Sequence, residues 1–106
     1  MFIKVISHEE IHGFLYIKKE REEKKMELKE TIEMMCSEDY KERFKAEYYQ
    51  TKIRYENLHK MVVKYEAGTL DFEPKCSLQL LKNQKASMGA YLYNLEIRAQ
   101  IEDIEL

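Results

Sequence analysis

The apolar residues of the segment 77–104 fall into two stripes when the segment is read as one helix. An α-helix turns by about 100° per residue, so each position can be assigned to a face. One stripe contains Leu81, Met88, Leu92, Leu95 and Ala99. The opposite stripe contains Ala86, Ala90, Tyr93, Ile97, Ile101 and Ile104. A helix that is apolar on two sides must be covered twice, so we predict that the rest of the chain covers one stripe and an extra segment or a second copy the other.

Apolar residues also recur at four-three spacing in the segment 40–66, which predicts a second long helix with a seam for packing. This seam contains Phe44, Tyr48, Thr51, Tyr55, Leu58, Val62 and Tyr65. The back of the same helix carries Ala46, Tyr49 and Ile53. An apolar patch on a solvated helix is a candidate contact surface, so we assign Tyr49 and Ile53 to an interface with another molecule.

The connection between these helices is short, which favours an antiparallel pair. Gly68 can adopt the left-handed conformation that ends a helix. Pro74 prevents the helix from continuing, and Ser77 offers a hydroxyl to cap the next one. The two segments therefore form a predicted hairpin in which Tyr65 pairs with Leu78.

The first 36 residues give a different pattern. Residues 1–6 are short, apolar and β-branched, which fits an edge strand, an extended arm or a loosely ordered terminus. Ser7 and Glu10 match a capping box, so a helix is predicted from there to about Cys36. Residues 18–25 are all charged with mixed signs, as expected for a solvated helical face. Ser37 and Asp39 indicate a fresh helix start after a break at Cys36.

These patterns predict an all-α protein that forms one domain over residues 1–106 and oligomerises. Residues 37–106 form a long antiparallel hairpin, and residues 1–36 contribute an arm, with a short strand as an option, and a helix. Gly89 lies inside the last helix, where it costs about 1 kcal/mol relative to alanine. Together with Ala86 and Ala90 it would allow a tight helix crossing between subunits; the simpler interpretation is a neutral glycine.

The composition excludes several classes of function. Lys and Arg number 18 against 20 for Asp and Glu, which gives a net charge of −2. No basic excess is available for DNA or RNA backbones, so we expect no nucleic-acid partner. No apolar run reaches membrane-spanning length, so we expect no membrane association. Cys36 and Cys76 give no disulfide framework, and we interpret them as reduced, buried or half-buried thiols of a cytoplasmic protein.

One motif suggests metal chemistry. His8, Glu9 and His12 match the zinc-protease pattern H-E-x-x-H, in which both histidines share a helix face. The motif lies at a chain end, and charged Glu10 occupies a position that is usually uncharged. We therefore predict no metal, no cofactor and no catalytic residue, so that the protein is not an enzyme.

Polar residues recur every seven positions along one edge of each predicted helix. They are Gln84, Tyr91 and Arg98 on one helix, and Glu47 and Arg54 on the other. In an antiparallel pair these edges face the same direction, so all five should line one side of the hairpin. Arginine offers a bidentate fork to phosphate, and tyrosine offers a stacking face. The pattern predicts a ligand site completed by a neighbouring protomer; the simpler alternative is a weak surface ion pair between Glu47 and Arg98.

The spacing of these residues also carries a family resemblance. It comprises the pattern Leu80-Leu81-x-x-Gln84-x-x-x-Met88-x-x-Tyr91-x-x-x-Leu95-x-x-Arg98, preceded by Glu47, Arg54 and Leu58. Over residues 37–106 the chain resembles small phage helical-hairpin proteins, among them the anti-CBASS and anti-Thoeris sponges. The resemblance implies an oligomer, often a hexamer, that binds cyclic nucleotides between protomers without chemistry. It also implies that Arg54, Gln84, Tyr91 and Arg98 contact the ligand.

Two functions remain open from the sequence. The first is a phage-encoded protein that sequesters a cyclic nucleotide immune signal in the host cytoplasm. The second is a small helical inhibitor that binds a host defence protein, in the manner of an anti-CRISPR factor. Solution mass and ligand binding distinguish them, because the first function is expected to require a homo-oligomer and a nucleotide.

Overall fold

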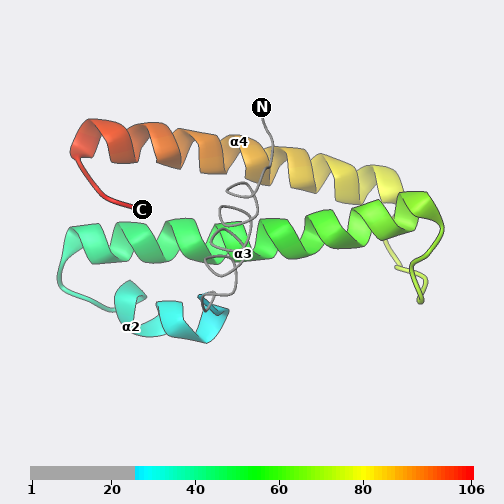
Figure 1. The fold of residues 1–106 in the computed structure, drawn as a ribbon, viewed down its shortest axis with the longest axis horizontal. Coiled ribbons are helices and arrows are strands. Elements are labelled where there is room, and N and C mark those ends of the chain that lie inside the picture. The colour runs from blue at the N-terminus through cyan, green and yellow to red at the C-terminus, as the bar shows by residue number, and fades with distance from the viewer. Residues whose placement is uncertain (1–25) are drawn as a thin grey trace, which may run out of the picture.

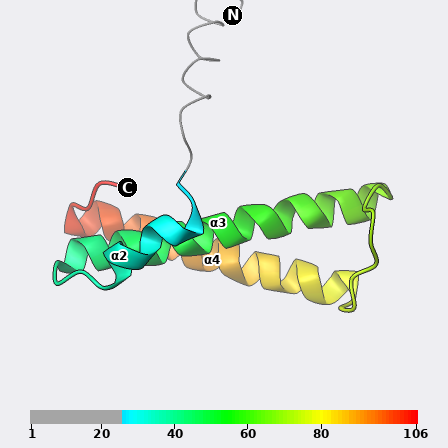
Figure 2. The ribbon, with the colours of Figure 1, turned by 90° about the horizontal axis from the view of Figure 1, so that it is seen from below.

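The computed structural model describes residues 26–106, which fold into helices without any strand (Figure 1). The elements are the 3₁₀ helix η1 (Leu28–Glu30) and the α-helices α2 (Thr31–Met35), α3 (Tyr40–Ala67) and α4 (Leu78–Glu102). Helices α3 and α4 run antiparallel, and α2 packs on the side of α3 away from α4 (Figures 1 and 2). The predicted all-α hairpin is confirmed.

Local signals in the sequence set the ends of the two long helices. The predicted break after Cys36 is present, and the Asp39 carboxylate accepts a hydrogen bond from the Lys41 amide at 3.0 Å. Asp39 is thus the N-cap, while the hydroxyl of Ser37 accepts a bond from the Asp39 amide. Gly68 has a φ of +78° and ends α3, and the Ser77 hydroxyl caps α4 by accepting from the Leu80 amide. Both of these caps are as predicted.

Contacts across the hairpin fix its register. Tyr48 bonds to Glu96, the ring of Tyr55 faces Gly89, and His59 bonds to Lys85. This register agrees with the predicted pairing of Tyr65 with Leu78 to within one residue. Periodic seams on two helices of similar length leave few ways to align them, which explains why register could be predicted.

The main core lies at the end of the hairpin opposite the loop. Its buried members are Phe44, Tyr48, Leu92, Leu95, Ala99 and Ile104. The two views together show that α3 and α4 cross at an angle rather than lying exactly parallel (Figures 1 and 2). The first predicted stripe of α4 therefore supplies the core residues Leu92, Leu95 and Ala99.

The C-terminal tail departs from the prediction. Helix α4 ends at Glu102, and Asp103 adopts a left-handed conformation with a φ of +60°. The amide of Ile104 then bonds to the carbonyl of Ala99 at 2.9 Å, and the Ile104 side chain is only 5% exposed. Ile104 is therefore part of the core rather than of the outer stripe of α4. The chain reverses at Asp103, which turns the Ile104 side chain back toward α3.

The chain's own N-terminal part covers the back of α3. Ala46 on this face and Thr31 of α2 are both fully buried. Tyr49 and Ile53 are half-buried: Tyr49 packs on the core, and Ile53 shares a cavity with residues 26–28. Tyr49 and Ile53 therefore have neighbours within the chain, and their assignment to an intermolecular interface stays a prediction.

Residues 26–36 also do not continue one long helix. Residues 26 and 27 are non-helical, and a new start follows in which Glu27 and Glu30 form a capping box. The possible strand at residues 1–6, the helix start at Ser7 and the motif His8, Glu9 and His12 lie outside the described residues.

Apart from Ile104, the second stripe of α4 is exposed. Tyr93 is 63% exposed and Ile101 76% exposed, and Ala86, Ala90 and Ile97 are exposed as well. No element of residues 26–106 covers this outer face of α4. Its coverage by a second copy stays a prediction.

Two further features bear on the chemistry predicted from the sequence. Cys36 and Cys76 are both free and exposed, which corrects the expectation of buried or half-buried thiols. Each lies beside a helix end, where the short connections leave side chains in solvent. Across the described helices, none combines the length and apolarity that a membrane span requires.

Candidate functional site

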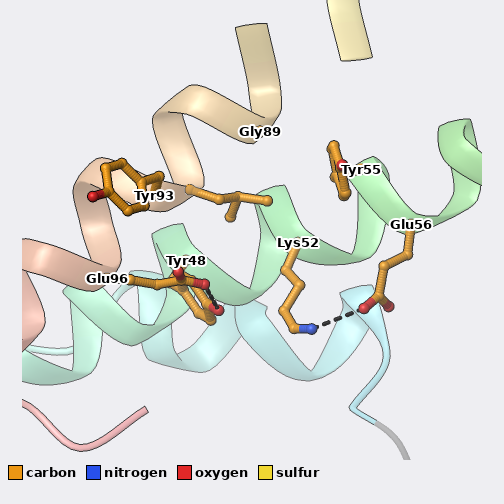
Figure 3. A pocket seen from close by; sticks show the side chains of 8 residues that line it. Tyr48, Lys52, Tyr55, Glu56, Gly89, Tyr93 and Glu96 are labelled. Atoms are coloured by element: carbon orange, nitrogen blue, oxygen red, sulfur yellow. Dashed lines mark hydrogen bonds and ion pairs between the residues drawn. The ribbon is translucent and has the colours of Figure 1, made fainter. Parts of the chain in front are cut away.

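A cavity of about 220 Å³ opens between α3 and α4 near the middle of the hairpin. Helix α3 lines it with Tyr48, Lys52, Tyr55 and Glu56, and helix α4 with Gly89, Leu92, Tyr93 and Glu96. In Figure 3, Tyr55 and Tyr93 lie at opposite ends of this cavity, with Gly89 on the helix between them. The hairpin therefore presents an opening flanked by two aromatic side chains, which we call the tyrosine cavity.

Gly89 determines how closely Tyr55 approaches α4. A Cβ atom at this position would lie 3.4 Å from Cε1 of Tyr55 and 3.7 Å from its hydroxyl oxygen. The absent side chain thus lets the ring lie directly against the helix backbone. This contact is within one chain and gives Gly89 a role in packing of the hairpin, while a crossing between subunits stays a prediction. Tyr55 also contacts His59 on the same helix: the two rings are stacked, with centroids 6.3 Å apart.

Four polar side chains of the tyrosine cavity are paired with one another. The hydroxyl of Tyr48 donates to Oε2 of Glu96 at 2.7 Å, and Nζ of Lys52 lies 2.8 Å from Oε2 of Glu56. Burial raises the pKa of Tyr48 above its usual value near 10, and the hydrogen bond to the Glu96 carboxylate raises it further. Tyr48 therefore stays a neutral donor at any physiological pH.

This shift predicts a loss of stability in alkali. Above pH 10 the unfolded chain releases the Tyr48 proton first, so the free energy of unfolding falls as pH rises, by up to about 1.4 kcal/mol per pH unit from this group. Below pH 10 the contribution is fully present. Urea unfolding measured from pH 9 to 12 should show a shallower decline for Tyr48→Phe. An identical slope in both proteins would contradict the assignment.

Two more cross-hairpin pairs lie on the same edge as the tyrosine cavity. Nζ of Lys85 lies 2.8 Å from Nδ1 of His59, one turn beyond Gly89 toward the loop. Nζ of Lys82 lies 2.9 Å from Oε2 of Glu66. The edge thus carries aromatic rings and ammonium groups in alternation.

The five predicted ligand residues do not line the tyrosine cavity. Glu47, Arg54, Gln84, Tyr91 and Arg98 are all exposed. Arg98 donates to the hydroxyl of Tyr40 at 2.9 Å and lies 4.9 Å from the ring centroid of Phe44. Within the described chain its ion pair is with Glu102, at 3.4 Å, in place of the predicted Glu47.

The structure therefore offers two candidate edges, of which the sequence indicated one. Tyr48 and Tyr55 appeared in the sequence as seam residues and Tyr93 as an interface residue, so their convergence was missed. The available signal was Gly89, a costly residue opposite an aromatic seam position in the predicted register. A glycine facing an aromatic residue across a helix pair indicates a close approach or an opening.

The groups that line the tyrosine cavity are suited to binding a planar ligand. Among residues 26–106, no group of three His, Cys, Asp or Glu side chains is arranged to hold a metal ion. The tyrosine cavity supplies stacking faces and hydrogen-bond partners, which are the groups that hold a planar, polar ligand.

Comparisons with known proteins place the hairpin in a family. Searches of curated proteins and of solved structures found no match. Residues 38–101 match the sequence model named Sequestin, which covers most of α3, the connection and α4. This match confirms the resemblance to the sponge hairpins. The chain belongs to the Sequestin family, whose members bind and sequester a signalling molecule.

Proposed function

We propose that this protein is a phage-encoded anti-defence factor that sequesters a cyclic nucleotide immune signal in the bacterial cytoplasm. Membership of the Sequestin family supports binding of a signal, and the tyrosine cavity supports a nucleotide as that signal. The protein removes the signal molecule by binding it and performs no reaction on it. The observation that carries the proposal is the cavity between α3 and α4, which Tyr55 and Tyr93 line at its two ends.

The cavity supplies what a nucleobase requires. A base stacked on an aromatic side chain gains about 1–3 kcal/mol, and every base has a face for this contact. Tyr55 and Tyr93 offer two such faces at the ends of the opening. The Glu96 carboxylate and the Lys52 ammonium offer an acceptor and donors to the polar edge of the base.

Calorimetry with a panel of cyclic di- and trinucleotides and cyclised ADP-ribose tests this function. We expect saturable heat with at least one ligand, and intact ligand recovered by chromatography after the protein is denatured. Recovery of a cleaved ligand would contradict sequestration, and the absence of heat with every ligand would contradict the proposal as a whole.

We also propose that a second copy covers the outer face of α4. Ile97, Ile101 and Tyr93 lie exposed on this face, and continuous apolar surface of this kind marks association sites. A second copy is the occupant that the double-faced pattern of α4 implies, since the first stripe is already buried. Tyr93 belongs both to this face and to the tyrosine cavity, so association would help to close the ligand site.

Ile101→Glu is expected to reduce the solution mass to that of a monomer, because a charge buried in an apolar contact is strongly unfavourable. Light scattering coupled to gel filtration measures the mass. The matched control is Leu80→Glu, which alters a 54% exposed leucine outside this outer stripe and should leave the mass unchanged. A wild-type monomer would refute the predicted assembly.

The alternative function is inhibition of a host defence protein, through the patch of Tyr49 and Ile53 or through the charged residues 18–25. Tyr49 and Ile53 are half-buried, and residues 18–25 lie outside the described residues. A monomeric protein that binds no nucleotide and captures one host protein in stoichiometric amount would favour this alternative.

A further inference from the structure

Three lysines along the tyrosine-cavity edge of the hairpin differ in the group that lies beside their ammonium nitrogen. Lys52 lies 2.8 Å from a Glu56 carboxylate oxygen, and Lys82 lies 2.9 Å from one of Glu66. Lys85 instead meets the ring nitrogen of His59 at 2.8 Å. Imidazole carries no negative charge, so the ammonium of Lys85 keeps its full positive charge on this edge.

We propose that Lys85 and His59 form a phosphate subsite for the nucleotide whose base occupies the tyrosine cavity. The proposal rests on the proposed function and adds the position of the phosphate. It places the ligand lengthwise along the hairpin edge, with its base between Tyr55 and Tyr93 and its phosphate toward the loop.

The charges of the cavity itself favour a base inside the cavity and a phosphate outside it. Two carboxylates, those of Glu56 and Glu96, line the cavity. A phosphate inside the cavity would therefore be repelled, whereas a neutral base would not. Among residues 26–106, Lys85 is the next lysine along this edge, and its ammonium group contacts an imidazole instead of a carboxylate, so the phosphate is drawn out of the cavity toward it.

The spacing of the two subsites suits one nucleotide. Lys85 precedes Gly89 by four residues, which is about 6 Å along a helix. A base and its phosphate are separated by a single ribose, which spans a gap of this order. Tyr55 joins the two subsites, because its ring contacts Gly89 and also stacks on His59.

The Lys85–His59 bond also prepares donors for phosphate. An ammonium group only donates, so Nδ1 of His59 accepts and the ring proton resides on Nε2. Lys85 keeps two further N–H donors, and His59 keeps one. Together they provide three donors, which matches the acceptor-rich oxygens of a phosphate.

The experiment compares nucleosides with their 5′-monophosphates for adenine, guanine, cytosine and uracil, by NMR titration of the full chain. For whichever base binds, we expect the monophosphate to bind about fivefold to tenfold more tightly than the nucleoside, as for a charge-assisted contact near the surface. Lys85→Gln and His59→Gln should each reduce this ratio toward one. The matched control is Lys82→Gln, whose lysine is neutralised by Glu66, and it should keep the ratio of the wild type.

Each outcome decides the question. Equal affinity for nucleoside and monophosphate, or an unchanged ratio in Lys85→Gln, refutes the phosphate subsite while base binding still supports the proposed function. If only Lys82→Gln loses the preference for the monophosphate over the nucleoside, the phosphate lies elsewhere and the proposed subsite is refuted as well. Binding of no nucleoside, no monophosphate and no member of the cyclic panel refutes both proposals. Chemical shifts of the imidazole protons report directly whether the phosphate reaches His59.

Discussion

Tyr55→Leu is expected to weaken nucleotide binding by about ten- to a hundredfold, because stacking of a base on an aromatic ring contributes about 1–3 kcal/mol. Leucine retains an apolar side chain of moderate size, so the half-buried position stays packed against α4. The substitution therefore removes the flat face without removing the wall of the cavity. Calorimetry with the ligand selected from the cyclic nucleotide panel measures the effect.

Tyr91→Leu is the matched control for this prediction. Tyr91 lies on the opposite edge of the hairpin, among the five residues that the sequence pattern assigned to the ligand, and it is 40% exposed. If the tyrosine cavity is the site, this variant binds like the wild type. The reverse result, full binding by Tyr55→Leu and loss in Tyr91→Leu, would move the site to the edge of Arg54, Gln84 and Arg98.

Leu95→Ala is expected to lower the free energy of unfolding by about 3 kcal/mol, within the range found for leucine to alanine changes in well-packed cores. Leu95 is 1% exposed and belongs to the buried cluster with Phe44, Leu92 and Ile104. Two long helices with one small core cannot collapse around the missing atoms without separating. For a chain of this size the midpoint of thermal unfolding should fall by about 15 °C.

Leu80→Ala provides the comparison, because Leu80 lies on the same helix and is 54% exposed. Its effect on the free energy of unfolding should stay within about 0.5 kcal/mol, as for surface changes in general. Circular dichroism during urea unfolding measures both variants. Similar losses for Leu80→Ala and Leu95→Ala would show that the core of the hairpin lies elsewhere, for example under an association contact on another face of α4.

Stability and binding depend on different parts of the same helix pair. The core that stabilises the hairpin lies toward its open end, and the tyrosine cavity lies beside it in the middle. Leu92 belongs to both, so it links the packing of the core to the floor of the cavity. A protein that only sequesters a ligand needs such a preformed space and no moving catalytic group.

The helix ends and the register were determined by the sequence itself, because both depend on local chemistry. Gly68 ends α3 since it alone among nearby residues adopts a positive φ without strain, and the hydroxyl of Ser77 caps α4. The seam of α3 and the first stripe of α4 repeat with the helical period, so their pairing follows from geometry. Family membership followed from the same spacing, and the match to Sequestin confirms it.

Only the tertiary structure decided which edge of the hairpin opens into a cavity and what covers the back of α3. Side-chain fit between α3 and α4 decides where a cavity remains, and the close approach of Tyr55 to Gly89 joins residues far apart in the sequence. Ile104 entered the core because the chain reverses at Asp103, a non-glycine residue with positive φ that periodicity cannot reveal. Helical periodicity assigns residues to faces, whereas the fit of particular side chains across those faces determines where a ligand can enter.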